Sequence, residues 1–330
     1  MARVLERVSV SLALFLFFLQ LSTPSQERRL EDAIKESPSP SALESVPMGP
    51  SLRASLREAL GARDYTRAET LLVDEINQNP KSPQLLTLLG GIFFLDGKYL
   101  NTAVAMKKAE ALAPLDDQSR FTLAMAYITL NHRDWARPEL EKLARNDPRN
   151  ALYPYWLSRL AYDAMQFTAA VANARKAISL NSRFVKAYDN LGLSYEALAK
   201  FDDAVEAYRQ AVRLNRESQP GSPWPALNFG SLLIKLDRLE EAELNLKEAL
   251  QSDPKLPRAH YQMGLLLEKQ KKDAEAIQEL RHAAALNPAY AEPYYALGKI
   301  YQRMGDRQQA EQAWSTFQKL KKEQPQEAKH

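Results

Sequence analysis

A regular spacing of small side chains constrains the fold of this chain more than any other feature of its sequence. The positions that recur in one frame are Gly90, Ala124, Ser158, Gly192, Gly230, Gly264 and Gly298. Neighbouring members of this series differ in sequence number by 34, except that Gly192 and Gly230 differ by 38. Because self-similarity at a fixed period of this size is typical of stacked-repeat architectures, we expect one repeated structural unit rather than several unrelated domains.

Two further sets of positions keep the same register. Twelve residues beyond each small residue lie Thr102, Ala136, Ala170, Ala204, Ala242, Ala276 and Ala310. Seven residues further on lie Ala109, Leu143, Ala177, Ala211, Ala249, Ala283 and Phe317. Extending the frame towards the N-terminus adds a weaker unit, with Leu56 at the small position but Ala68 and Pro80 in place. The sequence therefore predicts eight consecutive units.

Two units carry the pattern most clearly. One contains Tyr188, Leu191, Gly192, Tyr195, Ala204, Tyr208 and Ala211, and the last contains Tyr294, Leu297, Gly298, Tyr301, Ala310 and Trp314. In these residues the chain resembles the tetratricopeptide repeat family, whose pattern is a large residue, Leu-Gly, Tyr, Ala, an aromatic residue and Pro. The resemblance covers residues 49–324 and implies an all-α fold, a right-handed superhelical solenoid of antiparallel helix pairs. It also implies a role in protein–protein interaction.

The repeat frame sets the domain organisation. Repeats are predicted at 49–82, 83–116, 117–150, 151–184, 185–218, 223–256, 257–290 and 291–324. A Ser- and Pro-rich linker is predicted at 26–48, and a polar tail at 325–330. Four extra residues at 219–222, followed closely by Trp224, interrupt the array. The interruption is either a tolerated loop insertion, or a hinge or partner contact that uses Trp224.

The small residues at fixed positions have a packing explanation. A helix pair that cannot bury its apolar face alone stacks on its neighbours. Gly192 and Ala204 are expected to let the two helices of one pair approach closely, while Leu191, Tyr195 and Tyr208 fill the space around that contact. A large side chain at either small position should therefore overpack the pair, at a cost of about 1 to 3 kcal/mol.

The first 25 residues predict export. Arg3 and Arg7 precede an apolar run at 8–21, and small residues follow up to Ser25, which is the layout of a secretory signal. At about 1.5 Å per residue, this run of 14 residues spans roughly 21 Å, short of the roughly 30 Å hydrocarbon core of a membrane. Cleavage after Ser25 would give a periplasmic or secreted protein, whereas an uncleaved segment at 8–26 would anchor the chain in a membrane, facing outside the cytoplasm. A buried core helix is the third alternative.

Composition and motifs exclude several classes of function. The 44 basic and 41 acidic residues give a formal net charge of +3, so no strong electrostatic field indicates nucleic-acid binding. The chain has no cysteine, which removes disulfides, thiolate metal sites, thiol nucleophiles and a lipoprotein anchor. None of the four histidines has a metalloprotease-type partner, and no nucleophile-elbow, phosphate-loop or dinucleotide motif occurs. We therefore expect no catalytic, cofactor or metal site.

The remaining candidate for function is a surface. In the family that this chain resembles, the first helix of each unit lines a concave groove that presents side chains to a ligand. Mapped onto this sequence, that groove carries Tyr155, Trp156, Arg159, Tyr162, Lys186, Asn190, Trp224, Asn228, Arg258, Tyr261, Gln262, Tyr295 and Lys299. Aromatic and Arg anchors with amides between them suit an extended peptide, whose backbone needs hydrogen-bond donors and acceptors. For Tyr155 and Tyr295, ordinary packing between units is the alternative interpretation.

Three amides in this set, Asn190, Asn228 and Gln262, share one repeat position and suggest a short amide ladder. The carboxylate clamp of some family members is not reproduced, because Asp189 and Leu193 depart from its pattern, as does Gln262. Binding of the C-terminal tail of a chaperone is therefore not expected.

The last repeat has an unusual pair of aromatic residues. Phe317 replaces the usual alanine, and Trp314 lies nearby with no further repeat to cover them. These rings predict either a cap on the end of the core or a homotypic contact that gives a homo-oligomer.

Two functions are consistent with these observations. The first is an exported, non-catalytic scaffold that binds a peptide or protein in the groove. The alternative is an envelope-anchored assembly or secretion accessory factor. The two differ in whether the mature chain begins near Gln26 or retains Met1.

Overall fold

The computed structural model describes residue 43 and residues 46–218 and 221–323. In the two long described stretches every regular element is an α-helix. The helices are α3 (Pro50–Gly61), α4 (Tyr65–Gln78), α5 (Pro83–Leu95), α6 (Tyr99–Glu110), α7 (Asp117–Thr129), α8 (Arg133–Asn146), α9 (Leu152–Asp163), α10 (Phe167–Leu180), α11 (Val185–Ala197), α12 (Phe201–Arg216), α13 (Trp224–Lys235), α14 (Leu239–Ser252), α15 (Pro257–Lys269), α16 (Asp273–Leu286), α17 (Ala291–Met304) and α18 (Arg307–Glu323). The predicted all-α fold is confirmed over these residues.

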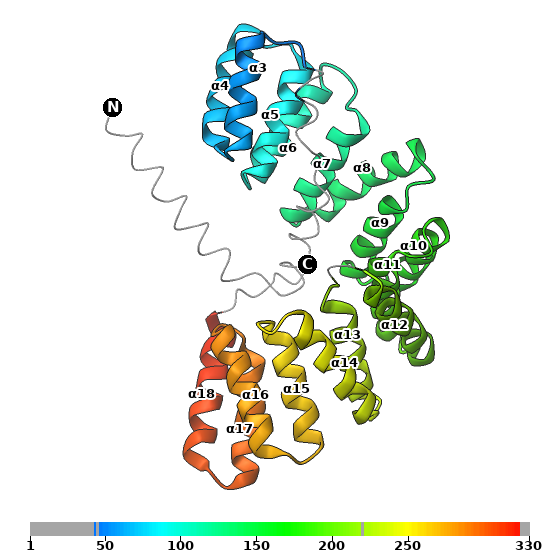
Figure 1. The fold of residues 1–330 in the computed structure, drawn as a ribbon, viewed down its shortest axis with the longest axis vertical. Helices are drawn as coiled ribbons and strands as arrows, with labels where there is room; N and C mark the ends of the chain where they lie inside the picture. The colour runs from blue at the N-terminus through cyan, green and yellow to red at the C-terminus, as the bar shows by residue number, and fades with distance from the viewer. Residues whose placement is uncertain (1–42, 44–45, 219–220, 324–330) are drawn as a thin grey trace, which may run out of the picture. The chain divides into compact units, whose positions relative to one another are not determined.

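These helices follow one another as antiparallel pairs, from α3 with α4 to α17 with α18 (Figure 1). None of the described helices has the length and hydropathy required to cross a membrane. The predicted signal or anchor at 1–25, most of the predicted linker at 26–48 and the predicted tail at 325–330 lie outside the described residues.

The described residues form two compact units, one ending at residue 160 and the other starting at residue 161. The N-terminal unit contains α3 to α8 and most of α9. The C-terminal unit contains the end of α9 and α10 to α18. Most of the candidate groove residues belong to the C-terminal unit.

One backbone motif ends the first helix of every pair. The chain leaves the helix through a residue with left-handed backbone angles, which is Arg63, Gly97, Asn131, Met165, Ala199, Asp237, Lys271 or Gly305. The next backbone N–H then donates to the carbonyl five positions earlier, as from Lys200 to Tyr195 O at 2.9 Å and from Asp306 to Tyr301 O at 3.0 Å. This Schellman-type bond satisfies a carbonyl that the helix leaves unpaired, and its repetition gives each hairpin the same turn.

The small residues mark the closest approach of the two helices in a pair, as the sequence predicts. A Cβ atom added at Gly192 would lie 2.6 Å from the ring of Tyr208, and one added at Gly264 would lie 2.7 Å from Leu280. Tyr208 is fully buried, and its hydroxyl donates a hydrogen bond to Glu196 Oε2 at 3.2 Å. The ring therefore fills the space that the missing side chain of Gly192 leaves.

The apolar core of each unit runs between its helix pairs. In the N-terminal unit, one core cluster joins Leu56 and Leu72 to two residues from the predicted linker, Leu43 and Val46, which are 3% and 4% exposed. Arg53 donates from Nη2 to Val46 O at 2.9 Å. The end of the predicted linker thus packs against the first helix pair, because it carries apolar side chains that cover the open side of that pair.

The break in the array is held at its C-terminal side by one side chain. Asn215 donates from Nδ2 to Ser222 O at 2.8 Å, and its Oδ1 accepts the Ser222 backbone N–H at 2.9 Å. Two residues later, Trp224 begins α13. Asn215 therefore fixes the point at which the chain re-enters the repeat frame.

The last repeat has aromatic contacts around α18. The ring of Tyr295 lies 5.2 Å from that of Phe317, and Lys321 Nζ lies 6.0 Å from the Phe317 ring centroid. Trp314 covers Gly298 in the place that Tyr208 takes over Gly192. The two aromatic residues of this repeat are therefore half-buried against α17.

Candidate functional site

The first helices of the C-terminal unit contact one another directly. Contacts join α11 to α13, α13 to α15, and α15 to α17. We call the side of these four helices that carries the predicted groove residues the first-helix wall. These residues are Lys186, Asn190, Trp224, Asn228, Arg258, Tyr261, Gln262, Tyr295 and Lys299. The wall is a continuous surface because each helix contributes side chains next to those of the following first helix.

Three predicted groove residues lie in the N-terminal unit, on α9. Tyr155 is 1% exposed and Trp156 is completely buried. The guanidinium of Arg159 donates to Tyr155 Oη at 3.0 Å and lies 5.6 Å from the Trp156 ring centroid. Because a buried ring offers no area to a ligand, Tyr155 and Trp156 act in core packing, and we leave both out of the candidate binding surface. For Tyr155 this agrees with the packing alternative.

Asn228, at the centre of the wall, is held by a buried carboxylate from the preceding repeat. Its Nδ2 donates to Asp189 Oδ1 at 2.9 Å and to Oδ2 at 3.2 Å. Asp189 has no exposed surface, and Asn228 is 8% exposed. A carboxylate oxygen can only accept, so it pairs with the nitrogen of the Asn228 amide and not with its oxygen, which fixes which way that amide points. The amide oxygen accepts no hydrogen bond from the described residues.

The other two amides of the predicted ladder differ in their surroundings. Asn190 is 4% exposed, and its backbone carbonyl accepts a bond from Ser194 Oγ at 2.7 Å. Gln262 is half-buried, and its side chain makes no hydrogen bond with the part of the chain that the structure describes. The wall therefore offers one deeply set, oriented amide and one more accessible amide on the next first helix.

An aromatic cluster lies at the N-terminal ends of α13, α15 and α17. The guanidinium of Arg258 lies 5.8 Å from the Trp224 ring centroid, and Tyr261 meets Tyr290 edge-on at 5.3 Å. Burial raises the pKa of the Tyr290 hydroxyl, although the positive charge of Arg258 opposes that rise. Arg258 thus joins the ring of Trp224 to the Tyr261 and Tyr290 pair.

Several charges on the first helices are paired with charges from a neighbouring repeat. Lys235 Nζ lies 2.7 Å from Glu196 Oε1, and Glu268 lies 3.5 Å from Lys299 and 3.2 Å from Arg303. This pairing leaves amides and aromatic rings as the groups best placed to select a ligand.

Tyr162 lies on α9, at the start of the C-terminal unit. Its ring packs edge-on against Phe167 at 5.5 Å. Burial raises the pKa of its hydroxyl, with a further rise from the negative charge of Glu196 and a partial reduction from Arg258. The Tyr162 hydroxyl is therefore affected by the charges of Glu196 and Arg258, which lie on first helices of the same unit.

Tyr295 remains accessible at the far end of the wall. Its side chain is 49% exposed although one face of the ring packs on Phe317. Tyr295 therefore packs on its neighbour and still offers surface to a ligand, whereas Tyr155 is buried by its packing.

The histidine and acidic side chains of the described residues make contacts that stabilise the fold. His260 Nδ1 lies 2.7 Å from Glu279 Oε2, and its Nε2 lies 2.9 Å from Pro254 O. Within the described ranges, no three histidine, aspartate or glutamate side chains are arranged to hold a metal ion. The carboxylates instead bond to helix ends and to basic partners.

Two residues that shape the wall are not among those predicted for it. Asp189 shares the repeat helix with Asn190 but orients an amide 39 residues away. Tyr290 lies in the turn before α17 and completes the aromatic cluster. A search of each repeat for polar residues one position before the amide would have found Asp189, whereas no repeat rule indicates Tyr290.

Antiparallel helix pairs whose first helices line one face define the class of helical-repeat scaffolds. Within this class, models described as tetratricopeptide repeat match residues 185–218 and 291–324, and a model described as TPR repeat matches 230–271 and 269–305. Residues 185–218 and 230–324 are thus tetratricopeptide repeats. Among curated proteins, none matches the chain in sequence.

Several solved structures are similar to this fold. A tetratricopeptide repeat protein from Parabacteroides merdae ATCC 43184 matches with a TM-score of 0.62 and 16% identity, over 79% of this chain and 99% of that chain. PilW, described as a widely conserved type IV pilus biogenesis factor, matches with a TM-score of 0.56 and 19% identity, over 61% of this chain and 92% of its own. The APC/C heterotetramer Cut9–Hcn1 matches with a TM-score of 0.54 and 18% identity, over 77% of this chain and 49% of that chain. At these identities the similarity is one of fold.

Proposed function

We propose that this protein is an exported, non-catalytic scaffold that binds an extended peptide segment of a partner protein along the first-helix wall. Tetratricopeptide repeat proteins bind peptides or proteins, and they are typically non-catalytic. The observation that carries the proposal is the oriented amide of Asn228, held by buried Asp189 with its oxygen left unpaired by the described residues. An acceptor that is already oriented suits a peptide N–H, because binding then costs no conformational entropy for ordering the Asn228 side chain.

The surroundings of Asn228 suit the same ligand. Gln262, on the next first helix, adds a second amide, and amides can both donate to and accept from a peptide backbone. Tyr261 and Tyr295 supply aromatic area on the same wall. Because the acids Glu196 and Glu268 are paired with lysine or arginine, a strongly charged ligand gains little from the wall. The wall therefore favours a largely uncharged extended segment.

The proposal is tested by capturing the partner from the native compartment with the full chain and with variants. Gln262→Ala removes an amide that makes no hydrogen bond with described residues, so folding should not suffer. Asn228→Leu keeps the volume of the side chain but removes its hydrogen bonds. Each variant should reduce the recovered partner about tenfold, the effect expected when one hydrogen bond to a ligand is lost in a desolvated site.

The matched control is Gln278→Ala, an exposed glutamine on α16, which is a second helix of the same unit. It should retain the partner at the level of the unaltered chain. Circular dichroism melting curves establish that each variant is folded. Undiminished capture by folded Gln262→Ala and Asn228→Leu would contradict binding at the wall.

Export in this proposal rests on the sequence of the first 25 residues. The basic leader, the apolar run and the small residues up to Ser25 support a secretory signal. Mass spectrometry of the mature protein tests this, since cleavage predicts an N-terminus at Gln26. Recovery of an intact Met1 in a membrane fraction would instead support the second candidate, an anchored assembly or secretion factor. The fold of PilW is compatible with that second candidate without selecting it.

A further inference from the structure

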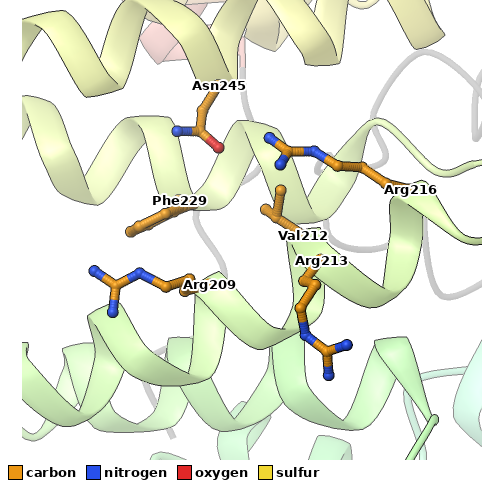
Figure 2. Close-up of a pocket in the computed structure, with 6 residues that line it drawn as sticks. All are labelled: Arg209, Val212, Arg213, Arg216, Phe229 and Asn245. Atoms are coloured by element: carbon orange, nitrogen blue, oxygen red, sulfur yellow. The ribbon is translucent and has the colours of Figure 1, made fainter.

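A recess lies on the second-helix side of the C-terminal unit, away from the residues of the first-helix wall. Its volume is about 320 Å³, and it is lined by Arg209, Val212, Arg213, Arg216, Phe229 and Asn245. The first four residues belong to α12, while Phe229 comes from α13 and Asn245 from α14. Figure 2 shows Val212 and Phe229 at the centre, with Asn245 on one side and the three arginines around them. We call this site the arginine recess.

The floor of the arginine recess is apolar. Val212 and Phe229 are 4% and 5% exposed, and they belong to the core cluster of the unit. A volume of this size accommodates one large side chain of a ligand. The floor thus favours an apolar side chain, because its burial releases water from both surfaces.

Asn245 supplies a buried acceptor beside this floor. The residue is 8% exposed, and its Nδ2 donates to Glu241 O at 2.8 Å, which fixes the orientation of the amide. Its Oδ1 is buried and has no hydrogen-bond partner among the residues that the structure describes. In Figure 2 this oxygen is directed towards the side of Arg216 and Val212. A buried acceptor left unpaired is costly, so a ligand that brings an N–H would relieve that cost.

The rim carries three guanidinium groups on one face of α12. Arg209 pairs with Glu206 at 2.9 Å, and Arg213 pairs with Glu217 at 3.3 Å. The side chains of both pairs are 41% to 59% exposed. Exposed ion pairs of this kind contribute little to stability, so a carboxylate from a ligand can replace the present partner at small cost.

The third guanidinium bridges two second helices. Arg216 on α12 donates from Nε and Nη2 to the carboxylate of Glu248 on α14, with the shortest distance 2.7 Å. This pair closes one end of the arginine recess and leaves Arg209 and Arg213 as the groups that a ligand would meet.

We propose that the arginine recess binds an acidic peptide segment that inserts one apolar side chain. Such a segment supplies an apolar group for Val212 and Phe229 and a backbone N–H for Asn245. Its carboxylates can exchange with Glu206 and Glu217 as partners of Arg209 and Arg213. A phosphate or nucleic-acid backbone would meet the arginines but brings no N–H to the buried oxygen. The proposal is independent of the first-helix wall, because no residue is shared between the two surfaces.

The test uses the full chain and a set of fluorescein-labelled octapeptides followed by fluorescence anisotropy. Each peptide has a central apolar pair, drawn from Phe, Leu, Ile, Met and Trp, with glutamates on both sides. One matched set replaces the glutamates with lysines, and another replaces the apolar pair with serines. At least one acidic apolar peptide should bind, and its lysine and serine counterparts should not.

Variants locate the binding. The double variant Arg209→Gln/Arg213→Gln should weaken binding of the acidic peptide about threefold or more, since two exposed ion pairs with the peptide are lost. The control Arg307→Gln/Lys319→Gln removes the same charge from α18 and should bind as the unaltered chain does. Gln262→Ala should also leave this affinity unchanged, which separates the arginine recess from the first-helix wall.

Three results would overturn the proposal. These are the absence of binding by every acidic apolar peptide, equal binding by the lysine or serine peptides, and unchanged affinity in folded Arg209→Gln/Arg213→Gln. Melting curves of the double variant establish folding, which the exposure of both arginine side chains favours.

Discussion

The substitution Gly192→Ala tests whether close approach within a helix pair holds the fold together. The added Cβ atom would lie 2.6 Å from Cδ1 and Cε1 of Tyr208 and 2.9 Å from its Cγ. Ordinary carbon contacts are about 3.5 to 4.0 Å, so the ring or the helix must move by roughly 1 Å. Tyr208 has no exposed surface, and its hydroxyl is bonded to Glu196. The ring therefore has no open space into which it can retreat.

The expected magnitude follows from two opposing effects. Overpacking a buried site typically costs about 1 to 3 kcal/mol. Because the rigid ring of Tyr208 faces Gly192, we expect a cost of about 3 kcal/mol here. Alanine in a helix interior recovers about 1 kcal/mol relative to glycine. Gly192→Ala should thus lower the free energy of unfolding by about 2 kcal/mol. Gly91→Ala is the matched control, because nothing lies within 4 Å of its added Cβ, and it should stabilise the protein by about 1 kcal/mol.

The assay is urea denaturation followed by circular dichroism, with the two variants compared under the same conditions. A second measurement places Gly192→Ala in a Tyr208→Leu background, where the destabilisation should shrink because the obstructing ring is gone. If Gly192→Ala stabilised the protein as much as Gly91→Ala does, the close approach of the two helices would not be a constraint on this fold.

Three further predictions concern buried polar and aromatic groups. The hydrogen bond to Glu279 raises the pKa of His260, against the effect of burial. The stabilisation of the fold by protonated His260 is therefore fully present below about pH 6.5 and is lost as pH rises through the raised pKa. Melting temperatures from pH 5 to 9 should show this loss in the unaltered chain, and the His260→Gln variant should not show it. Arg120→Met leaves the buried carboxylate of Glu139 without its shortest partner and should cost about 3 kcal/mol in urea denaturation, while Arg120→Met/Glu139→Leu should cost less than the sum of the single changes. Trp156→Ala should cost about 3 to 5 kcal/mol by the same assay, and partner capture by the fraction that remains folded should be unchanged.

The helix pairs could be predicted because their signal is local and repeated. The small residues at 192, 230, 264 and 298 each meet a bulky side chain on the second helix of the same pair, namely Tyr208, Leu246, Leu280 and Trp314. The separation along the chain is the same in all four cases and lies within one repeat, so the sequence alone relates the two helices. The turn between them is less obvious, because six of its eight left-handed positions are not glycine. Packing of the two helices overrides the usual preference for glycine at such positions.

The candidate site could be predicted only in part, because it depends on contacts between repeats. Repeat position correctly placed Asn228 and Gln262 on first helices, but it gave no sign that Asp189 orients Asn228 from 39 residues away. The same rule selected Tyr155 and Trp156, which neighbouring side chains bury. Repeat position thus identifies the face of a helix on which a residue lies, whereas the side chains of adjacent repeats determine how much of it is covered.

Photocrosslinking at single positions tests the binding face most directly. A benzophenone amino acid at Gln262, on first helix α15, is compared with the same group at Gln278, on second helix α16, in protein expressed in its native compartment. We expect a partner peptide crosslinked to position 262, identified by mass spectrometry, and none at position 278. A partner crosslinked at position 278 and absent from position 262 would contradict this expectation.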